Sequence, residues 1–297
     1  MSDAPPRFDY FAAFSRNIGW LTRAEQDQIR SKRIAIAGLG GVGGSHLLTL
    51  TRLGVGSFHI ADFDHFALQN FNRQAGATMR TLGRPKVEVL EEMARDVNPT
   101  VTVRRFPEGV SSQNLAEFLG GVDLFVDGFD FFALDMRRET FAACRRLGIP
   151  AITAAPLGMG AAVLVFLPGQ MSFEDYFCLD GSSRPEQALR FLIGLSPALL
   201  QRRYLVERTA VDFASQKGPS TVMACELCAG MAATEALKLL LGRGKVRAAP
   251  WSTHFDAYRR RLARVWRPWG NRNPLQRIAL ALARRQLGQA VFTGARQ

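Results

Sequence analysis

Apolar positions along this chain follow two alternating patterns, short apolar runs and longer segments with helical spacing. The short runs include Arg33–Ala37, Ser57–Ala61 and Val122–Val126, and each is typical of a buried strand. Between them, segments such as Ser45–Leu53 and Lys86–Val97 carry apolar residues at helical intervals. Strands that alternate with helices form parallel sheets covered on both faces. The pattern therefore predicts an α/β fold with a Rossmann-like, doubly wound, mostly parallel sheet.

The second half of the chain departs from this rhythm. Residues 168–221 mix Gly, Ser and Pro with two short helical pieces at Pro185–Ile193 and Pro197–Glu207. Because long ordered connections are usually functional, we interpret this stretch as a long crossover segment over the active face. Around it the sequence predicts two buried strands, a long apolar helix, a last strand and a basic amphipathic helix: Ala151–Ala155, Ala161–Phe166, Val222–Leu241, Pro250–Ala257 and Asn273–Gln286.

The charge of the chain is concentrated at its C-terminal end. The 297 residues carry a formal net charge of +12, and ten arginines with no acidic residue from Ala257 onward contribute +10 of it. The preceding 256 residues are therefore nearly neutral. We expect a folded domain over residues 1–256 and an arginine-rich, basic helical tail over residues 257–297. Its arginines alternate with aromatic and aliphatic residues, which suits a dimer-packing extension, an anionic membrane surface, or RNA or DNA.

The cysteines and the hydropathy of the chain indicate in which cellular compartment the protein is expected. Four cysteines without paired spacing do not make a disulfide framework, and the N-terminal residues lack the apolar core of a signal peptide. The uncharged stretch Leu147–Phe173 is interrupted by three prolines and four glycines, which suits buried strands better than a spanning helix. We expect a cytoplasmic protein, peripheral to a membrane if its tail binds lipid.

A glycine-rich turn follows the first apolar run, in the sequence Gly38-Leu39-Gly40-Gly41-Val42-Gly43-Gly44. Gly38, Gly40 and Gly41 permit a tight turn and close approach of a phosphate, and Gly43 lets the next helix pack on the strand. Asp62 ends the second run, 22 positions after Gly40, where a carboxylate would bind ribose hydroxyls. This pattern predicts a nucleotide site, and by itself it suits NAD(P) or FAD as well as ATP.

Three further charged residues favour a triphosphate. Arg73 and Lys86 are fixed cations, which ATP needs near its β- and γ-phosphates because it carries about four negative charges. Asp130 follows the next strand and supplies a carboxylate of the kind that holds Mg²⁺ beside phosphate oxygens. By this segmentation all of them fall at the carboxyl ends of strands, where ligands bind in open α/β sheets.

Together these residues resemble a family, the ThiF/MoeB/HesA-type adenylyltransferases, which are related to the activating enzymes of ubiquitin-like proteins. The resemblance covers roughly residues 14–256. It rests on five motifs in the family's order: Asp62-Phe63-Asp64, Gln69-Asn70-Phe71-Asn72-Arg73-Gln74, Gly83-Arg84-Pro85-Lys86-Val87, Asn98-Pro99 and Asp127-Gly128-Phe129-Asp130.

The resemblance implies a reaction and a set of residues. A carboxylate attacks the α-phosphate of ATP to give an acyl-adenylate and pyrophosphate, the expected carboxylate being the C-terminus of a ubiquitin-like or sulfur-carrier protein or a peptide. Family members are commonly homodimers in which an arginine reaches across to the γ-phosphate, and Arg16 occupies that place here. Asp130 holds the magnesium, and ATP is bound by Gly40, Asp62, Asp64, Asn70, Arg73, Gln74 and Lys86.

Some residues depart from the family pattern. Family members usually have Asn or Ser after the second aspartate of this motif and an arginine four or five positions further on. Here Phe131 and Phe132 follow Asp130, and the nearest arginine is Arg137. Zinc is not expected, because Cys225 and Cys228 lie within a predicted helix and a third thiol still falls short of a Cys₄ site.

Two residue types are expected to take no part in the chemistry. Cys178 lies where some relatives form a thioester, but its apolar flanks and the neighbouring Asp175 and Asp180 favour an inert buried thiol. A carboxylate is already ionised at pH 7, so none of the four histidines needs a catalytic role. His46 and His59 are expected to be structural.

Three other functions stay open at this point. The first is a tRNA-modifying, ATP-dependent cyclase or dehydratase of the same family. The second is an NAD(P)- or FAD-dependent oxidoreductase, which would leave Lys86 and Asp130 without a role. The third is a non-enzymatic scaffold that binds nucleotide but has lost turnover, which the departure from the family pattern at Phe131 and Phe132 keeps open.

Overall fold

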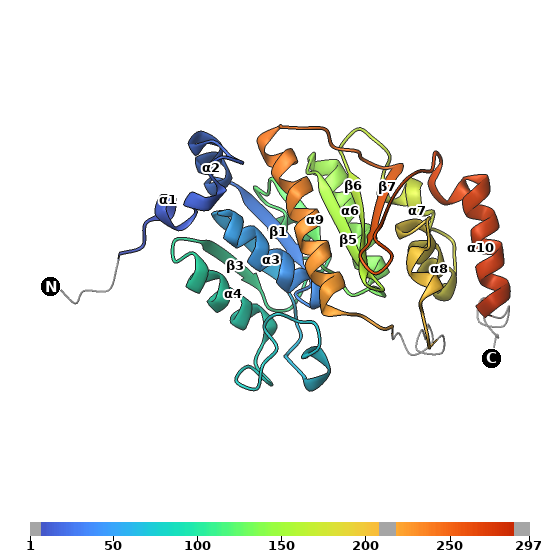
Figure 1. The fold of residues 1–297 in the computed structure, drawn as a ribbon, viewed down its shortest axis with the longest axis horizontal. Helices are drawn as coiled ribbons and strands as arrows, with labels where there is room; N and C mark the ends of the chain where they lie inside the picture. Colours follow the sequence, from blue (N-terminus) through green and yellow to red (C-terminus); the bar gives the residue numbers. More distant parts are fainter. Residues whose placement is uncertain (1–6, 208–217, 288–297) are drawn as a thin grey trace.

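One sheet organises the computed structural model of the protein, which describes residues 7–207 and 218–287 (Figure 1). Its strand order is β3-β2-β1-β4-β5-β6-β7-β8. Neighbouring strands from β3 to β5 pair in parallel, and those from β5 to β8 pair antiparallel. The strands are β1 Arg33–Ala37, β2 Ser57–Ala61, β3 Thr102–Phe106, β4 Leu124–Asp127, β5 Ala151–Leu157, β6 Gly160–Phe166, β7 Trp251–Asp256 and β8 Arg261–Trp266.

Helices cover both faces of the sheet, because alternate residues of each central strand are apolar on both sides. On one face Ile34, Ile36 and Val126 join a core formed with α2 Arg23–Arg30, α3 Gly41–Leu53, α4 Lys86–Val97 and α9 Val222–Leu241. On the other, Ala35 and Phe125 join a core formed with α5 Leu115–Phe118, α6 Leu134–Leu147, α7 Phe173–Phe177 and α8 Arg184–Leu195. The predicted doubly wound α/β fold is confirmed.

Short elements complete the two ends of the molecule. The N-terminal part contains α1 Tyr10–Ala13 and η1 Ser15–Asn17. Near the C-terminus, η5 Gly270–Arg272 leads into α10 Pro274–Leu287, which packs on α8 at the opposite end of the molecule from α1 and α2 (Figure 1). Two further 3₁₀ turns are η2 Leu68–Asn70 and η3 Leu200–Arg203.

Three predicted elements differ from the structure. The helix after the glycine turn begins at Gly41 rather than Ser45, since the glycines themselves form its first turn. Pro197–Glu207 is not helical beyond the short turn η3. Pro250–Ala257 is not the last strand, because β8 pairs with β7 and stacks Trp266 near Trp251. The boundary expected at residue 256 remains a prediction, although the sheet continues past it.

The crossover segment packs mainly on a face of the sheet and only partly at its carboxyl edge. Its aromatic side chains Phe173, Phe177 and Phe191 fill the core between β6 and α6. The segment returns to the carboxyl edge at Tyr204, whose hydroxyl accepts a hydrogen bond from the Met159 amide at 2.8 Å. Residues 208–217 of the segment lie outside the described residues. Among the described residues, no helix is both long and apolar enough to span a membrane.

Two buried histidines are held neutral by the fold. His46 lies on α3 without a hydrogen-bond partner at either ring nitrogen among the described residues, and His254 on β7 contacts the Ser196 hydroxyl at 2.8 Å. Burial lowers the pKa of each imidazole to about 4. His59 is also structural, since its Nδ1 lies 2.7 Å from the Phe118 carbonyl oxygen.

These pKa shifts predict an acid-sensitive fold. In the unfolded chain the imidazoles take up protons below about pH 6.5, while in the folded protein they resist protonation to about pH 4. The free energy of unfolding should therefore fall as the pH decreases from 7 to 4.5, by about 2 kcal/mol for each histidine. Urea unfolding across this range should show a shallower fall for His46→Leu than for the wild type, and equal slopes in the two proteins would contradict the assignment.

Candidate active site

The glycine turn after β1 is held by direct backbone contact with the turn after β4. Gly38 has φ +84°, and a Cβ atom on it would stand 2.2 Å from the carbonyl oxygen of Gly128. A Cβ atom on Gly43 would stand 1.8 Å from the carbonyl oxygen of Gly38. Only glycine fits at these positions. The turn therefore sits at the switch point between β1 and β4 and directs the amides of the α3 N-terminus outward, where they favour an anion.

Asp62 braces this turn from the end of β2. Its carboxylate accepts hydrogen bonds from the Leu39 amide at 2.6 Å and from the Asp64 amide at 2.8 Å. Burial raises the pKa of the Asp62 carboxyl, and the positive charge of Lys86 opposes that rise. Asp62 thus has a structural role in addition to the ligand contact expected from the sequence.

Lys86 is a buried cation aimed at the same edge of the sheet. Its ammonium lies 2.8 Å from the carboxylate of Asp64, and its side chain is 5% exposed while that of Asp64 is 53% exposed. Lys86 is the first residue of α4, and its backbone amide donates a hydrogen bond to the Asp64 carbonyl oxygen at 2.9 Å. An accessible carboxylate therefore neutralises the lysine where a polyphosphate could also do so.

Arg73 contacts the glycine turn from the long connection between β2 and α4, residues 62–85, which is called the excursion below. A Cβ atom on Gly41 would lie 3.4 and 3.5 Å from Cγ and Cδ of Arg73, and 2.9 Å from Sγ of Cys225. The guanidinium donates to the side-chain oxygen of Asn72 at 2.9 Å, and Asn72 in turn donates to the Ser220 carbonyl at 3.0 Å. Arg73 is thus fixed beside the N-terminus of α3 by the residue before it and by the end of the crossover segment.

Two amide side chains of the same excursion are buried. The Asn70 side-chain oxygen accepts from the Ala67 amide at 2.9 Å and closes the turn η2. The Gln74 amide nitrogen lies 3.7 Å from a Cβ atom built on Gly40. Gln74 is 7% exposed, and its side-chain oxygen has no hydrogen-bond partner among the described residues. An unsatisfied buried acceptor beside a phosphate-type turn fits a nucleotide hydroxyl or amino group.

Asp130 lies on the turn that touches the glycines. The Asp130 side chain is exposed and accepts a hydrogen bond from the Phe132 amide at 3.0 Å. Arg137 of α6 shapes this turn, because it donates to the carbonyl oxygens of Phe129 at 2.8 Å and Asp130 at 3.0 Å. It also pairs with the buried carboxylate of Asp127 at 2.8 Å. Arg137, which departs in position from the arginine of the family pattern, therefore holds the Asp130 turn.

Arg16 lies away from the other predicted residues. It belongs to η1, whose Asn17 donates to the carbonyl oxygen of Leu53 at the C-terminal end of α3 at 3.2 Å. The glycine turn is at the other end of α3, about 18 Å along a helix of this length. Arg16 is exposed. Within one chain, the structure therefore brings together every predicted site residue except this arginine.

The cysteines are buried and carry raised pKa values. Burial raises the pKa of the Cys178, Cys225 and Cys228 thiols. No group of three or more His, Cys, Asp or Glu side chains in the described part of the chain is arranged to hold a metal ion. Asp130 offers a single exposed carboxylate, which suits Mg²⁺ because that ion is commonly bound through one or two carboxylates and phosphate oxygens.

Three contacts of the site were missed from the sequence. The sequence gives Asn72 a place in a motif but no role, suggests Cys225 only as a zinc ligand, and gives no role to Glu226. The Glu226 carboxylate accepts a hydrogen bond from Ser45 of α3 at 2.8 Å. The spacing of Cys225 and Glu226 in the first turns of α9 gave no signal, because their partners lie some 150 residues or more earlier in the chain.

Comparison with known proteins agrees with this geometry. The family model of the ThiF family matches residues 14–277. The chain belongs to the ThiF family. The match includes the glycine turn, the excursion with Arg73, the start of α4 at Lys86 and the Asp130 turn, so the resemblance expected from the sequence is confirmed.

Relatives of this ThiF-family chain include two that are named as adenylyltransferases. The sulfur carrier protein ThiS adenylyltransferase of Escherichia coli is 32% identical over 143 residues, 48% of this chain and 56% of that protein. The sulfur carrier protein adenylyltransferase of Thermus thermophilus is 30% identical over 224 residues, 74% of this chain and 73% of that protein. For several of the curated relatives, the matched stretch spans about half of their length.

Solved structures share the fold. E. coli MccB with ATP superposes with a TM-score of 0.62 at 17% identity, covering 85% of this chain and 70% of MccB. E. coli tRNA N6-threonylcarbamoyladenosine dehydratase superposes with a TM-score of 0.58 at 20% identity, covering 78% of this chain and 95% of that one. At these identities the likeness establishes the ThiF-type fold alone.

The Arg137–Asp127 ion pair predicts a large stability effect. Arg137→Met would leave the Asp127 carboxylate buried without its cation, and the free energy of unfolding should fall by about 3–5 kcal/mol. Its neighbour Arg138 pairs with Glu174 and Asp180 nearer the surface, so Arg138→Met should cost about 1 kcal/mol or less. Urea unfolding of both variants measures the difference, and equal losses would show that burial of the pair is unimportant.

Proposed function

We propose that the protein is a Mg-ATP-dependent adenylyltransferase that activates a carboxylate as an acyl-adenylate and releases pyrophosphate. The observation that carries this proposal is the meeting of two cations, Arg73 and Lys86, with one glycine turn whose neighbouring turn bears Asp130. A dinucleotide site satisfies its pyrophosphate largely with helix amides, so these cations favour a triphosphate. Membership of the ThiF family and the adenylyltransferase names of its relatives support the same reaction.

In this proposal the residues bind and orient, and no proton transfer is needed. The amides at the α3 N-terminus and Gly40–Gly43 receive phosphate oxygens, and Arg73 and Lys86 neutralise the charge of the leaving pyrophosphate. Lys86 exchanges its ion pair with Asp64 for one with the phosphates of the nucleotide. The side-chain oxygen of Gln74 accepts a hydrogen bond from the nucleotide. Asp130 is the residue that would hold magnesium, which would supply further charge neutralisation. The attacking carboxylate is ionised at neutral pH and only has to be positioned.

The proposed substrate is the C-terminal carboxylate of a small carrier protein or peptide. Two relatives are named for action on sulfur carrier proteins. The second candidate is a carboxylate borne by tRNA, because another relative is named a tRNA threonylcarbamoyladenosine dehydratase.

Removal of a phosphate-binding cation or of the metal carboxylate should abolish activation. Arg73→Ala and Asp130→Ala should each lower carboxylate-dependent pyrophosphate exchange by about 100-fold or more. Arg80→Ala is a matched control, since Arg80 is an exposed arginine of the same excursion. Wild-type exchange in the first two variants would contradict the proposal, and ATP binding without exchange across a panel of carriers would instead identify a non-enzymatic scaffold.

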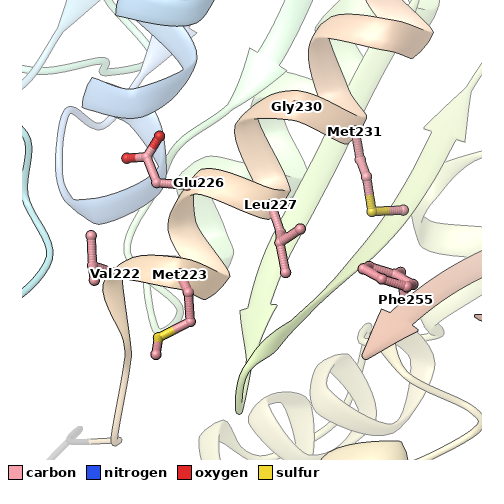
Figure 2. Close-up of a pocket in the computed structure, with 7 residues that line it drawn as sticks. All are labelled: Val222, Met223, Glu226, Leu227, Gly230, Met231 and Phe255. Atoms are coloured by element: carbon pink, nitrogen blue, oxygen red, sulfur yellow. The ribbon is translucent and has the colours of Figure 1, made fainter. Parts of the chain in front are cut away.

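We further propose that the enzyme works as a homodimer, with Arg16 entering the partner's site. An open apolar groove of about 700 Å³ runs along α9 and is lined by Met223, Leu227 and Met231, and Figure 2 shows Leu227 and Met231 on the side of Phe255 of β7. Near the far end of α9, Arg243 donates to the backbone carbonyl of the exposed Trp20. A two-fold axis across α9 would set the Arg16 end of one copy against the glycine-turn end of the other.

Mixing two inactive variants tests this arrangement. Arg16→Ala and Asp130→Ala should each be inactive alone. After unfolding and refolding together in equal amounts, they should recover about a quarter of wild-type exchange, because half of the dimers then contain one intact site. No recovery, with both variants folded and dimeric, would show that Arg16 acts within its own chain or not at all.

A further inference from the structure

One side of the helix α10 is buried against α8, and the opposite side exposes a row of apolar residues to solvent. Its Gln276 and Leu280 are buried, and Leu280 packs against Leu189 and Ile193 of α8. The Arg284 guanidinium, also facing α8, bonds both carboxylate oxygens of Glu186 at 3.0 and 2.5 Å. This side is therefore fixed to the body of the protein, and the position of the other side is fixed with it.

The outward side carries three aliphatic residues one helical turn apart. Leu275, Ile278 and Leu282 are 59%, 58% and 50% exposed, and their spacing of three and four residues sets them in one row. Arg277 and Arg285 are exposed on the same helix and have no ion-pair partner among the described residues. Such a row on a helix flanked by arginines is typical of a helix that lies on a surface of opposite charge.

The surrounding segment adds charge and an aromatic anchor. Residues 257–287 contain nine arginines and no acidic residue. Trp269, at the N-terminal boundary of η5, is 65% exposed, and η5 contacts α10. Tryptophan is enriched where an apolar surface meets water and lipid headgroups. Figure 1 shows α10 at the edge of the molecule, beyond α8, where a flat surface could reach it without approaching the glycine turn.

We propose that the outward side of α10 is a binding surface for an anionic lipid bilayer. Leu275, Ile278 and Leu282 enter the boundary between headgroups and acyl chains, while the arginines extend to the lipid phosphates. This inference does not depend on the proposed adenylation, because the residues it uses lie apart from the nucleotide site.

Two other occupants fit the surface less well. A second copy of the chain would pair this face with itself across a two-fold axis, setting arginines against arginines with no acidic residue to offset them. A nucleic acid would satisfy the arginines, but its phosphates offer nothing to a row of exposed Leu and Ile side chains. A bilayer of anionic lipid satisfies both features.

Co-sedimentation of the full-length protein with vesicles tests this proposal. The wild type should partition at least about tenfold more strongly onto phosphatidylcholine vesicles containing 30% phosphatidylglycerol than onto phosphatidylcholine alone, and added salt should weaken that binding. Both Leu275→Ser/Ile278→Ser/Leu282→Ser and Arg277→Gln/Arg285→Gln should lose about tenfold or more of it. The control variant Arg146→Gln/Leu147→Ser removes an exposed arginine and leucine from the end of α6 and should bind as the wild type does.

The variants alter exposed side chains, so circular dichroism and melting temperature should match the wild type and exclude misfolding. Equal sedimentation of wild type and the serine variant would overturn the proposal. It would also be overturned by tRNA binding that depends on the arginines while vesicles stay unbound. Self-association in sedimentation equilibrium that the serine variant abolishes, without vesicle binding, would assign the surface to a second copy and overturn it as well.

Discussion

The candidate site depends on the contact between two backbone turns at the centre of the sheet. The turns after β1 and β4 touch through Gly38 and Gly128, at a distance that no side chain would allow. This contact sets the N-terminus of α3 and the Asp130 turn side by side, and Asp62 locks the first turn through two backbone amides. Asp62 and Asp130 are therefore both placed at this contact.

The charges around the turn are balanced in two different ways. Asp127 and Arg137 neutralise each other in the interior and shape the Asp130 turn, so neither is available to a ligand. Lys86 instead pairs with the half-exposed Asp64, and Arg73 bonds to neutral oxygens. The first pair is structural, whereas the second set can exchange its partners for phosphate oxygens at little cost in desolvation.

Much of this was predictable because it is local in sequence. The strands Arg33–Ala37 and Ser57–Ala61 have the bounds that their apolar runs indicated. The gathering of Asp62, Lys86 and Asp130 at one edge follows from the shared direction of parallel strands.

What could not be predicted depends on contacts between distant segments. The sequence of β8 mixes arginines with apolar residues and on its own indicates a basic tail. Only its pairing with β7 shows that it is a strand of the sheet. Arg137 pairs with Asp127 because α6 directs its side chain back to the end of β4, and local spacing gives no sign of this pairing. The hydrogen bond from Asn72 to Ser220 spans 148 positions and has no signature in local spacing either.

The bond from Asn72 to Ser220 ties the Arg73 side of the candidate site to the end of the crossover segment. Asn72 holds the Arg73 guanidinium with its oxygen and the backbone just before α9 with its nitrogen. A single side chain, that of Asn72, therefore joins the segment that carries Arg73 to the end of the crossover segment. A displacement of the backbone at Ser220 would shift the Asn72 side chain and, with it, the hydrogen bond that Asn72 accepts from Arg73, so the end of the crossover segment and the cation beside the glycine turn are mechanically linked.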